Sequence, residues 1–213
     1  MIGAALGAVP RARGGAGMDS DRLRKQLDFI YEVDKVKHIV RKSKVFDGSK
    51  YENDAEHSWT VCLMACLLRE YANFEVDIAR VLLMLLIHDI VEVDAGDTFL
   101  YAEDRDSAPD REAAAARRIF GLLPDDQAGP FLAAWEEFEA RETNEAKFAS
   151  VFDRMEPVLQ NYKTEGSTWK KHGITRRMVL EKNRHIENGS AELWRFFQAL
   201  LEECVEKGYL EDS

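Results

Sequence analysis

Apolar residues recur at helical spacing along most of the chain, and no stretch alternates between apolar and polar positions for long enough to predict a strand. The first helical segment starts at Asp19 or Ser20, either of which can cap it, and a second is capped by Asp54. Further helices are expected over residues 77–92, 110–120, about 125–139, 143–163, about 175–187 and 190–207. This pattern predicts an all-α protein, built as a single bundle of about seven to nine helices.

The segment 77–92 is the most apolar of these helices and is apolar nearly all round, which is typical of a helix at the centre of a bundle. Its uninterrupted apolar run, Val81–Ile87, has only seven residues. A membrane-spanning helix needs roughly 20, so no membrane association is expected. Between the first two helices, Arg41-Lys42-Ser43-Lys44 indicates a basic turn, and residues 47–54 indicate a polar loop.

Length and charge narrow the class of protein. With 213 residues, at roughly 150 residues per domain, the chain is expected to hold one domain, with or without an appendage. Lys and Arg number 29 and Asp and Glu number 39, which gives a formal net charge of −10. A chain this acidic is not expected to bind nucleic-acid polymers or anionic membranes, which need a basic surface. A small anionic substrate, held by a metal ion and one or two local cations, remains compatible with this charge.

The beginning of the chain differs from the rest. Residues 1–18 are rich in Ala and Gly and contain two Arg residues but no acid. We interpret them as a disordered tail, with Met18 as an alternative start, and expect the folded domain over residues 19–210. A mitochondrial presequence is a weaker alternative, because the segment has no Ser and little amphipathic length. The sparse cysteines, Cys62, Cys66 and Cys204, do not indicate a disulfide framework, so a cytoplasmic location is expected.

Ionisable residues interrupt the apolar pattern at the end of the most hydrophobic helix, where His88, Asp89 and Glu92 follow one another closely. Burying an unpaired carboxylate costs several kcal/mol, so these groups need a partner or a wet cleft. On a helix, His88 and Asp89 are about 100° apart, and Glu92 lies one turn beyond His88 on the same side. All three side chains can therefore be directed toward the same point.

Two further positions repeat this interruption. His57 lies at the start of an amphipathic helix, and Asp153 lies beside the apolar face of helix 143–163. Taken singly, each has an ordinary explanation, such as a histidine satisfied in a core or an aspartate paired with Arg154 or Lys147. Their order on separate helices, together with His88-Asp89, indicates a metal site. Mixed nitrogen and oxygen ligands that leave positions open for water suit a hydrolytic divalent cation.

Three motifs carry a resemblance to a known family: Glu56-His57-Ser58, Leu86-Ile87-His88-Asp89-Ile90-Val91-Glu92 and Phe152-Asp153-Arg154. They resemble the motifs of the HD-domain metal-dependent phosphohydrolases. Within that superfamily, the sequence is most similar to the 5'-deoxynucleotidases and their eukaryotic HD-domain relatives. The likeness to this subfamily rests on Arg41, Glu92 and Gly96-Asp97, and the resemblance as a whole covers about residues 22–208.

The resemblance implies one divalent metal ion per chain, with four ligands: His57, His88, Asp89 and Asp153. It implies that Glu92 assists proton transfer, and that Asp97 lines the nucleotide site near the sugar or the attacking water. It also implies that Arg41 contacts the substrate phosphate. By its charge, the neighbouring Lys42 is a second candidate for neutralising that phosphate. The bacterial deoxynucleotidases follow that arginine with Trp, which helps to discriminate the sugar. This chain has Lys42 there, which leaves selectivity for deoxyribose open.

Metal identity and assembly are less constrained. Mixed nitrogen and oxygen ligation permits Mn²⁺, Co²⁺, Fe²⁺, Ni²⁺, Zn²⁺ or Mg²⁺. The resemblance implies a homodimer. The apolar C-terminal segment is one candidate surface for it, although the same residues could equally be core: Leu193, Trp194, Phe196, Phe197, Leu200 and Leu201.

Three functions remain open from the sequence. The first is hydrolysis of nucleoside 5'-monophosphates, with deoxynucleotides preferred. The second keeps the metal but changes the substrate to a dNTP, a cyclic nucleotide or an alarmone. Such relatives usually carry further domains or metal ligands, so the short chain favours a small monophosphate. The third is a metal-stabilised binding module without catalysis, against which the presence of Glu92 argues.

Overall fold

The computed structural model describes residues 20–102 and 108–213, so the predicted tail and Asp19 lie outside the described residues and the proposed start of the domain remains a prediction. The predicted all-α class is confirmed, since the described chain consists mainly of helices. They are α1 (Ser20–Val33), α2 (Asp54–Leu67), α3 (Ile78–Ile87), α4 (Glu92–Ala95), α5 (Ala108–Phe120), α6 (Asp125–Ala140), α7 (Asn144–Lys163), α8 (Ser167–His172), α9 (Arg176–Asn183), α10 (Ile186–Gly189) and α11 (Ala191–Glu206).

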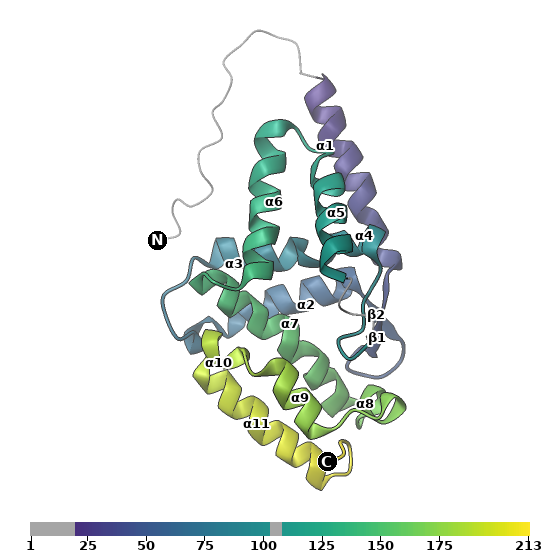
Figure 1. Ribbon diagram of the computed structural model, residues 1–213, viewed down its shortest axis with the longest axis vertical. Coiled ribbons are helices and arrows are strands. Elements are labelled where there is room, and N and C mark those ends of the chain that lie inside the picture. Colours follow the sequence, from purple (N-terminus) through teal and green to yellow (C-terminus); the bar gives the residue numbers. More distant parts are fainter. Residues whose placement is uncertain (1–19, 103–107) are drawn as a thin grey trace.

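Helix α7 is the central element of the fold. It starts where the Thr143 side chain accepts a hydrogen bond from the backbone N–H of Ala146, an N-cap that the sequence favours. Helices α2, α3, α6 and α10 all pack against it. In Figure 1, α7 crosses the middle of the molecule, with α1, α5 and α6 upright at one end and α9 and α11 at the other.

Two hydrophobic clusters build the core. The larger one joins α2, α3 and α7 to the C-terminal helices, and Phe148, Phe152, Phe197 and Leu201 are fully buried in it. The smaller one joins α1, α5 and α6 to residues Ile87, Ile90 and Val91. The segment that contains His88 and Asp89 therefore lies where the two clusters meet. Among the described residues, no helix combines the length and the apolar character that crossing a membrane requires.

A small hairpin departs from the sequence expectation. Strand β1 (Val40–Lys44) pairs antiparallel with β2 (Tyr51–Asn53), where a basic turn and a polar loop were expected. The strands are too short and too polar to show an alternating pattern, and they depend on tertiary support. Strand β1 packs against α7 and α8, and the Thr168 hydroxyl donates to the backbone oxygen of Lys42 at 3.0 Å. The hairpin thereby fixes the position of Arg41.

The helix predicted over 77–92 is divided into three parts. Helix α3 ends at Ile87, a 3₁₀ turn covers His88–Val91, and α4 continues to Ala95 before Gly96 turns the chain with φ of 75°. A 3₁₀ turn winds more tightly than an α-helix. The backbone oxygen of His88, at the start of this turn, accepts a hydrogen bond from the indole N–H of Trp135 at 3.2 Å. The predicted helix 175–187 is likewise divided, into α9 and α10.

The start of α2 also differs from the prediction. The capping residue is Asn53, whose side chain accepts from the backbone N–H of Glu56 while the Glu56 carboxylate accepts from the backbone N–H of Asn53. Asp54, the predicted cap, is fully buried and forms an ion pair with Arg41. The reciprocal bonds of a capping box satisfy two helix-end donors at once, so Asp54 is left available for the interior of the protein.

Candidate metal centre

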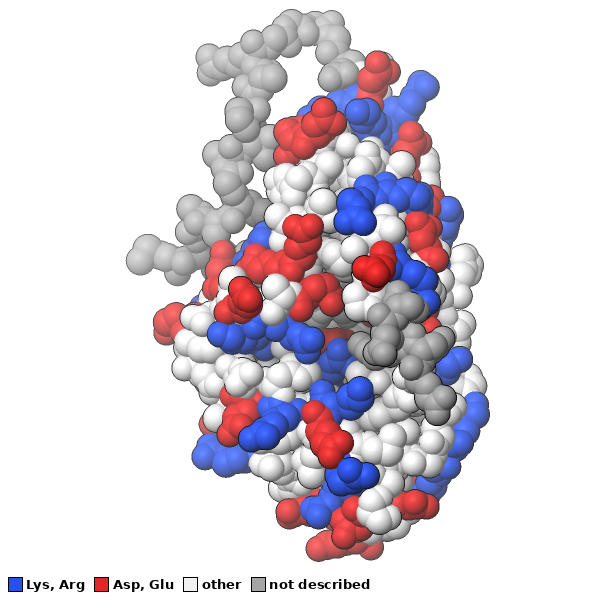
Figure 2. All heavy atoms as spheres, in the orientation of Figure 1, with Lys and Arg blue, Asp and Glu red and all other residues white. Residues whose placement is uncertain are grey.

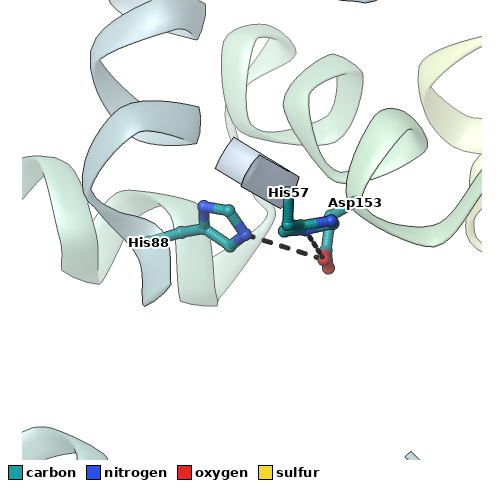
Figure 3. Close-up of side chains that lie close together, drawn as sticks. All are labelled: His57, His88 and Asp153. Carbon is teal, nitrogen blue, oxygen red and sulfur yellow. Dashed lines mark hydrogen bonds and ion pairs between the residues drawn. The ribbon is translucent and has the colours of Figure 1, made fainter. Parts of the chain in front are cut away.

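Three elements place nitrogen and oxygen donors around one point. His57 comes from the first turn of α2, His88 and Asp89 from the 3₁₀ turn after α3, and Asp153 from the middle of α7. Ligand atoms of His57, His88 and Asp153 all lie within 4.8 Å of one another. Figure 3 shows both imidazoles turned toward the Asp153 carboxylate. The structure thus brings together residues that are almost one hundred positions apart in the chain.

The fourth predicted ligand lies at the edge of this group. Asp89 Oδ1 is 3.2 Å from His88 Nε2, and Asp89 Oδ2 is 3.8 Å from His57 Nε2. Asp153 Oδ1 is 3.3 Å from His57 Nε2 and 3.7 Å from His88 Nε2. Both carboxylates therefore face the same two ring nitrogens.

Hydrogen bonds on the far side of each ring prepare these nitrogens for a metal ion. His88 Nδ1 lies 2.8 Å from the backbone oxygen of Leu85, which can only accept, so Nδ1 carries the proton. His57 Nδ1 lies 3.1 Å from a carboxylate oxygen of Glu156 and is oriented in the same way. In both rings Nε2 then offers a lone pair toward the shared point, and His88 Nε2 is buried without a hydrogen-bond partner. This donor set fits a divalent cation.

A second acidic pair lies behind His57. The Glu52 and Glu156 carboxylates are buried next to its Nδ1, at 3.7 Å and 3.1 Å. The Gln160 side-chain amide donates to the other oxygen of Glu156. Burial and the nearby Glu156 raise the pKa of Glu52 to about 8. We read this pair as the support that orients His57, since the ring nitrogen it faces is already used in a hydrogen bond.

Without a metal ion, the carboxylates of the centre favour the protonated form of His88. Burial alone would lower the pKa of His88, but Asp89 and Asp153 outweigh it and raise that pKa to about 10. Burial opposes ionisation of Asp153, yet Arg154 and the two histidines hold its pKa well below the usual value. Protons on the histidines thus offset the carboxylates in the metal-free protein, and a divalent cation would take their place.

Arg41 is tied to the acidic side of the centre. Its Nη1 lies 2.6 Å from Asp89 Oδ2 and 3.3 Å from Asp54 Oδ1, and its Nε lies 3.7 Å from Glu52 Oε2. Burial and the proximity of Asp89 raise the pKa of Asp54 to about 6 in spite of this arginine. Arg41 therefore links the hairpin to one of the predicted metal ligands.

A cavity opens from the centre, and seven of the eight residues expected from the sequence line it: Arg41, Lys42, His88, Asp89, Glu92, Asp97 and Asp153. His57 lies behind this wall, fully buried. Glu92 Oε2 and Asp97 Oδ2 are buried without a hydrogen-bond partner. Burial, together with Asp89 and Asp54, raises the pKa of Glu92 well above its usual value. The polar lining and the unsatisfied oxygens suit a polar ligand beside the metal ion.

Sequence reasoning missed four residues of this site: Glu52, Asp54, Glu156 and the cavity-lining Arg154. Glu156 carried a usable signal, because it follows Asp153 by three positions and so lies on the same side of a helix. Asp54 carried the same kind of signal, because it precedes His57 by three positions in α2. Glu52 carried none, because its place depends on the hairpin.

The helical fold and this donor set define a protein with a divalent-metal centre between helices. A family model described as an HD domain matches residues 33–194, and the chain belongs to this HD-domain family. A solved structure of a predicted metal-dependent phosphohydrolase from Magnetospirillum magnetotacticum MS-1 is 51% identical, with a TM-score of 0.88, over 92% of this chain and 98% of that chain. The chain is accordingly a metal-dependent phosphohydrolase of the HD type.

Other relatives support the same class. The 5'-deoxynucleotidase HDDC2 of Bos taurus is 30% identical over 149 residues, which cover 68% of this chain and 70% of the relative. The protein of the same name from Mus musculus is 28% identical over 72% of each chain. An HD-domain phosphohydrolase from Listeria innocua is 15% identical with a TM-score of 0.57, over 85% of this chain and 90% of that one, and shares the fold.

Proposed function

We propose that the protein hydrolyses nucleoside 5'-monophosphates, deoxynucleotides among them, to nucleoside and inorganic phosphate. The observation that carries the proposal is the pair of buried, unpartnered oxygens, Glu92 Oε2 and Asp97 Oδ2, in the cavity beside the metal donors. Buried polar atoms are nearly always satisfied, so a ligand with hydroxyl groups, or water, is expected to fill them. The relatives named 5'-deoxynucleotidase favour a nucleotide as that ligand.

The chemistry required is simple. A water oxygen bonds to phosphorus, the bond to the 5'-oxygen breaks, and the departing oxygen gains a proton. A divalent cation held by His57, His88, Asp89 and Asp153 would polarise the phosphoryl group and lower the pKa of water. We propose one such ion per chain.

Glu92 and Asp97 are then assigned different roles. Burial and neighbouring carboxylates raise the pKa of Glu92, and we assign its carboxyl group the transfer of a proton between water and the leaving oxygen. Burial also raises the pKa of Asp97, which lines the cavity. We assign Asp97 a hydrogen bond to a sugar hydroxyl or to the attacking water.

A panel of nucleotides tests the proposal. The metal-stripped protein is reloaded with Mn²⁺, Co²⁺, Mg²⁺ or Zn²⁺, and phosphate release is measured from paired deoxy- and ribonucleoside monophosphates, one dNTP and one cyclic nucleotide. We expect release from monophosphates, with the exposed Lys42 setting the deoxy-to-ribo ratio. Release only from the dNTP or the cyclic nucleotide would favour a metal-dependent hydrolase with one of those substrates. No release from any of the nucleotides would refute the nucleotidase proposal.

We also propose that the protein forms a homodimer in the cytoplasm, where its three free cysteines would stay reduced. The C-terminal surface suggested by the sequence is core, because five of its six residues are buried and only Phe196, at 51% exposure, is not. Large apolar side chains are exposed instead on α2 and α3: Trp59, Leu63, Leu67 and Leu86. Residues 57–68 contain no Asp, Glu, Lys or Arg, so two copies with a net charge of −10 can meet there without placing like charges in contact.

Replacing Leu67, which is 67% exposed at the end of α2, with Glu is expected to convert the dimer into a monomer. The reason is that the interface would then bury two unpaired carboxylates. Sedimentation velocity measures the change, and Phe196→Glu on α11 is the matched control, expected to stay dimeric. A wild-type protein that is monomeric at all concentrations would contradict the proposal, as would a dimeric Leu67→Glu variant.

A further inference from the structure

The phosphate of a nucleotide needs a cation that other groups have not already neutralised. Four basic residues line the cavity: Arg41, Lys42, Arg141 and Arg154. Arg41 is the one that the family resemblance assigns to the phosphate. In this chain, however, it is 87% shielded from solvent and faces the carboxylates of Asp89, Asp54 and Glu52. Burial and the nearby Glu156 raise the pKa of Glu52 to about 8, so this group is mainly neutral. A phosphate placed against Arg41 would still have to share the positive charge of Arg41 with the Asp89 and Asp54 carboxylates.

Among the described residues, Arg154 is paired with one carboxylate rather than with several. It follows the predicted ligand Asp153 in α7, lines the cavity, and has a side chain that is 18% exposed. Its Nε is buried and has no hydrogen-bond partner, and its one ion pair among the described residues is with Asp153 Oδ2 at 3.4 Å. A planar guanidinium with free N–H groups binds a phosphate through two parallel hydrogen bonds.

The surroundings of Arg154 keep this wall of the cavity positive. Arg141 contributes a second guanidinium, which lies 3.3 Å from His185 Nε2. Burial, with the charges of Arg154 and Arg141, lowers the pKa of His185 to about 4, so the imidazole is neutral and accepts from Arg141. Glu139 also lines this wall, but burial and Glu112 raise its pKa. Figure 2 shows Lys and Arg side chains gathered in a band across the middle of this face, over α7.

We propose that Arg154 is the residue that binds the phosphate of the substrate, and that Arg41 is a positioning residue for Asp89 and Asp54. Arg154 adjoins a predicted metal ligand, so its guanidinium and the cation would hold the same phosphate from two sides. The inference rests on the proposed phosphate-ester substrate and names the side chain that recognises it.

Binding of inorganic phosphate to the metal-loaded protein tests this without requiring turnover. In isothermal titration with inorganic phosphate, Arg154→Ala is expected to weaken binding about 10- to 100-fold, the range for losing hydrogen bonds to a charged group. Metal content should be unchanged, because no ligand atom is removed. Arg154→Lys should weaken binding less, because it keeps the charge but loses the paired geometry, and it serves as the test if the alanine variant does not fold.

Two further variants separate phosphate binding by Arg154 from the positioning role of Arg41. Arg41→Gln is expected to lower metal affinity and kcat while leaving the phosphate Kd of the metal-saturated protein within about twofold. Arg176→Ala, which removes a surface arginine paired with Asp212, should change neither. Unchanged phosphate binding in Arg154→Ala, or a larger loss in Arg41→Gln, would overturn the inference. If Arg154→Ala loses phosphate binding but the wild type hydrolyses no nucleotide, the inference stands and the nucleotidase proposal fails.

Discussion

Replacing His88 with alanine is expected to remove the bound metal ion and to reduce phosphate release by about 10³-fold or more. His88 Nε2 is buried and faces the Asp89 and Asp153 carboxylates, while the opposite ring nitrogen is fixed on the Leu85 carbonyl, so Nε2 is oriented to bind the metal ion together with them. A divalent cation supplies several kcal/mol of transition-state stabilisation, which converts to a loss of this size. Metal content by elemental analysis and phosphate release together measure the effect.

The matched control is His38→Ala, which removes an exposed histidine in the turn before the hairpin. That variant should keep both its metal and its activity. Thermal unfolding of the His88→Ala protein would show whether the fold survives. A folded His88→Ala protein that retains stoichiometric metal would contradict the assignment of this residue as a ligand.

Replacing Glu92 with glutamine is expected to lower turnover by about 10²- to 10⁴-fold, the usual contribution of a positioned proton donor or acceptor. The substitution keeps the shape of a side chain that lines the cavity with one buried, unpartnered oxygen, but it removes the exchangeable carboxyl proton. Metal binding should persist, because Glu92 is not among the four proposed ligands. Activity and metal content measured on the same preparation separate the two effects.

Glu75→Gln, at an exposed position before α3, is the control and should behave as the wild type. The same experiment distinguishes an enzyme from a metal-stabilised binding module. A binding module would be unaffected by Glu92→Gln, whereas a hydrolase would lose turnover and keep its metal. Loss of the metal together with turnover would mean that Glu92 is a ligand and that its assigned role is wrong.

Long amphipathic segments were the predictable part of this fold. The start of α7 follows from Thr143 as a cap and from apolar residues at helical spacing, and both are properties of the local sequence. The hairpin was not predictable, because β1 depends on packing against α7 and α8. The 3₁₀ turn at His88–Val91 also escaped prediction, since periodicity alone cannot distinguish a tighter turn from a continued helix.

The candidate site was likewise predictable only in part from the local sequence. His57, His88, Asp89 and Asp153 stood out because each interrupts an apolar pattern, and the structure brings them together. The partners of Arg41 did not stand out, because Asp54 looks like a helix cap in the sequence and Glu52 lies in a polar loop. The ion pairs between Arg41 and these carboxyl groups could be recognised only once the structure placed the hairpin beside the 3₁₀ turn.

The C-terminal apolar residues illustrate a further limit. Their spacing fitted a core and an interface equally well, because both bury the same stripe of a helix. The structure places Phe197 and Leu201 fully inside the chain, while Leu67 and Leu86 of the equally apolar α2 and α3 remain exposed. Only the arrangement of the neighbouring helices decides which apolar face is covered within one chain.

We propose that phosphate-ester hydrolysis by this protein depends on one divalent cation, bound by His57, His88, Asp89 and Asp153. The most direct measurement is a titration of the metal-stripped protein with Mn²⁺ or Co²⁺, following phosphate release from a deoxynucleoside monophosphate. Activity is expected to rise linearly and to level off at about one metal ion per chain. Activity that is independent of added metal in a fully stripped protein, or no phosphate release at saturating metal in a folded protein, would contradict it.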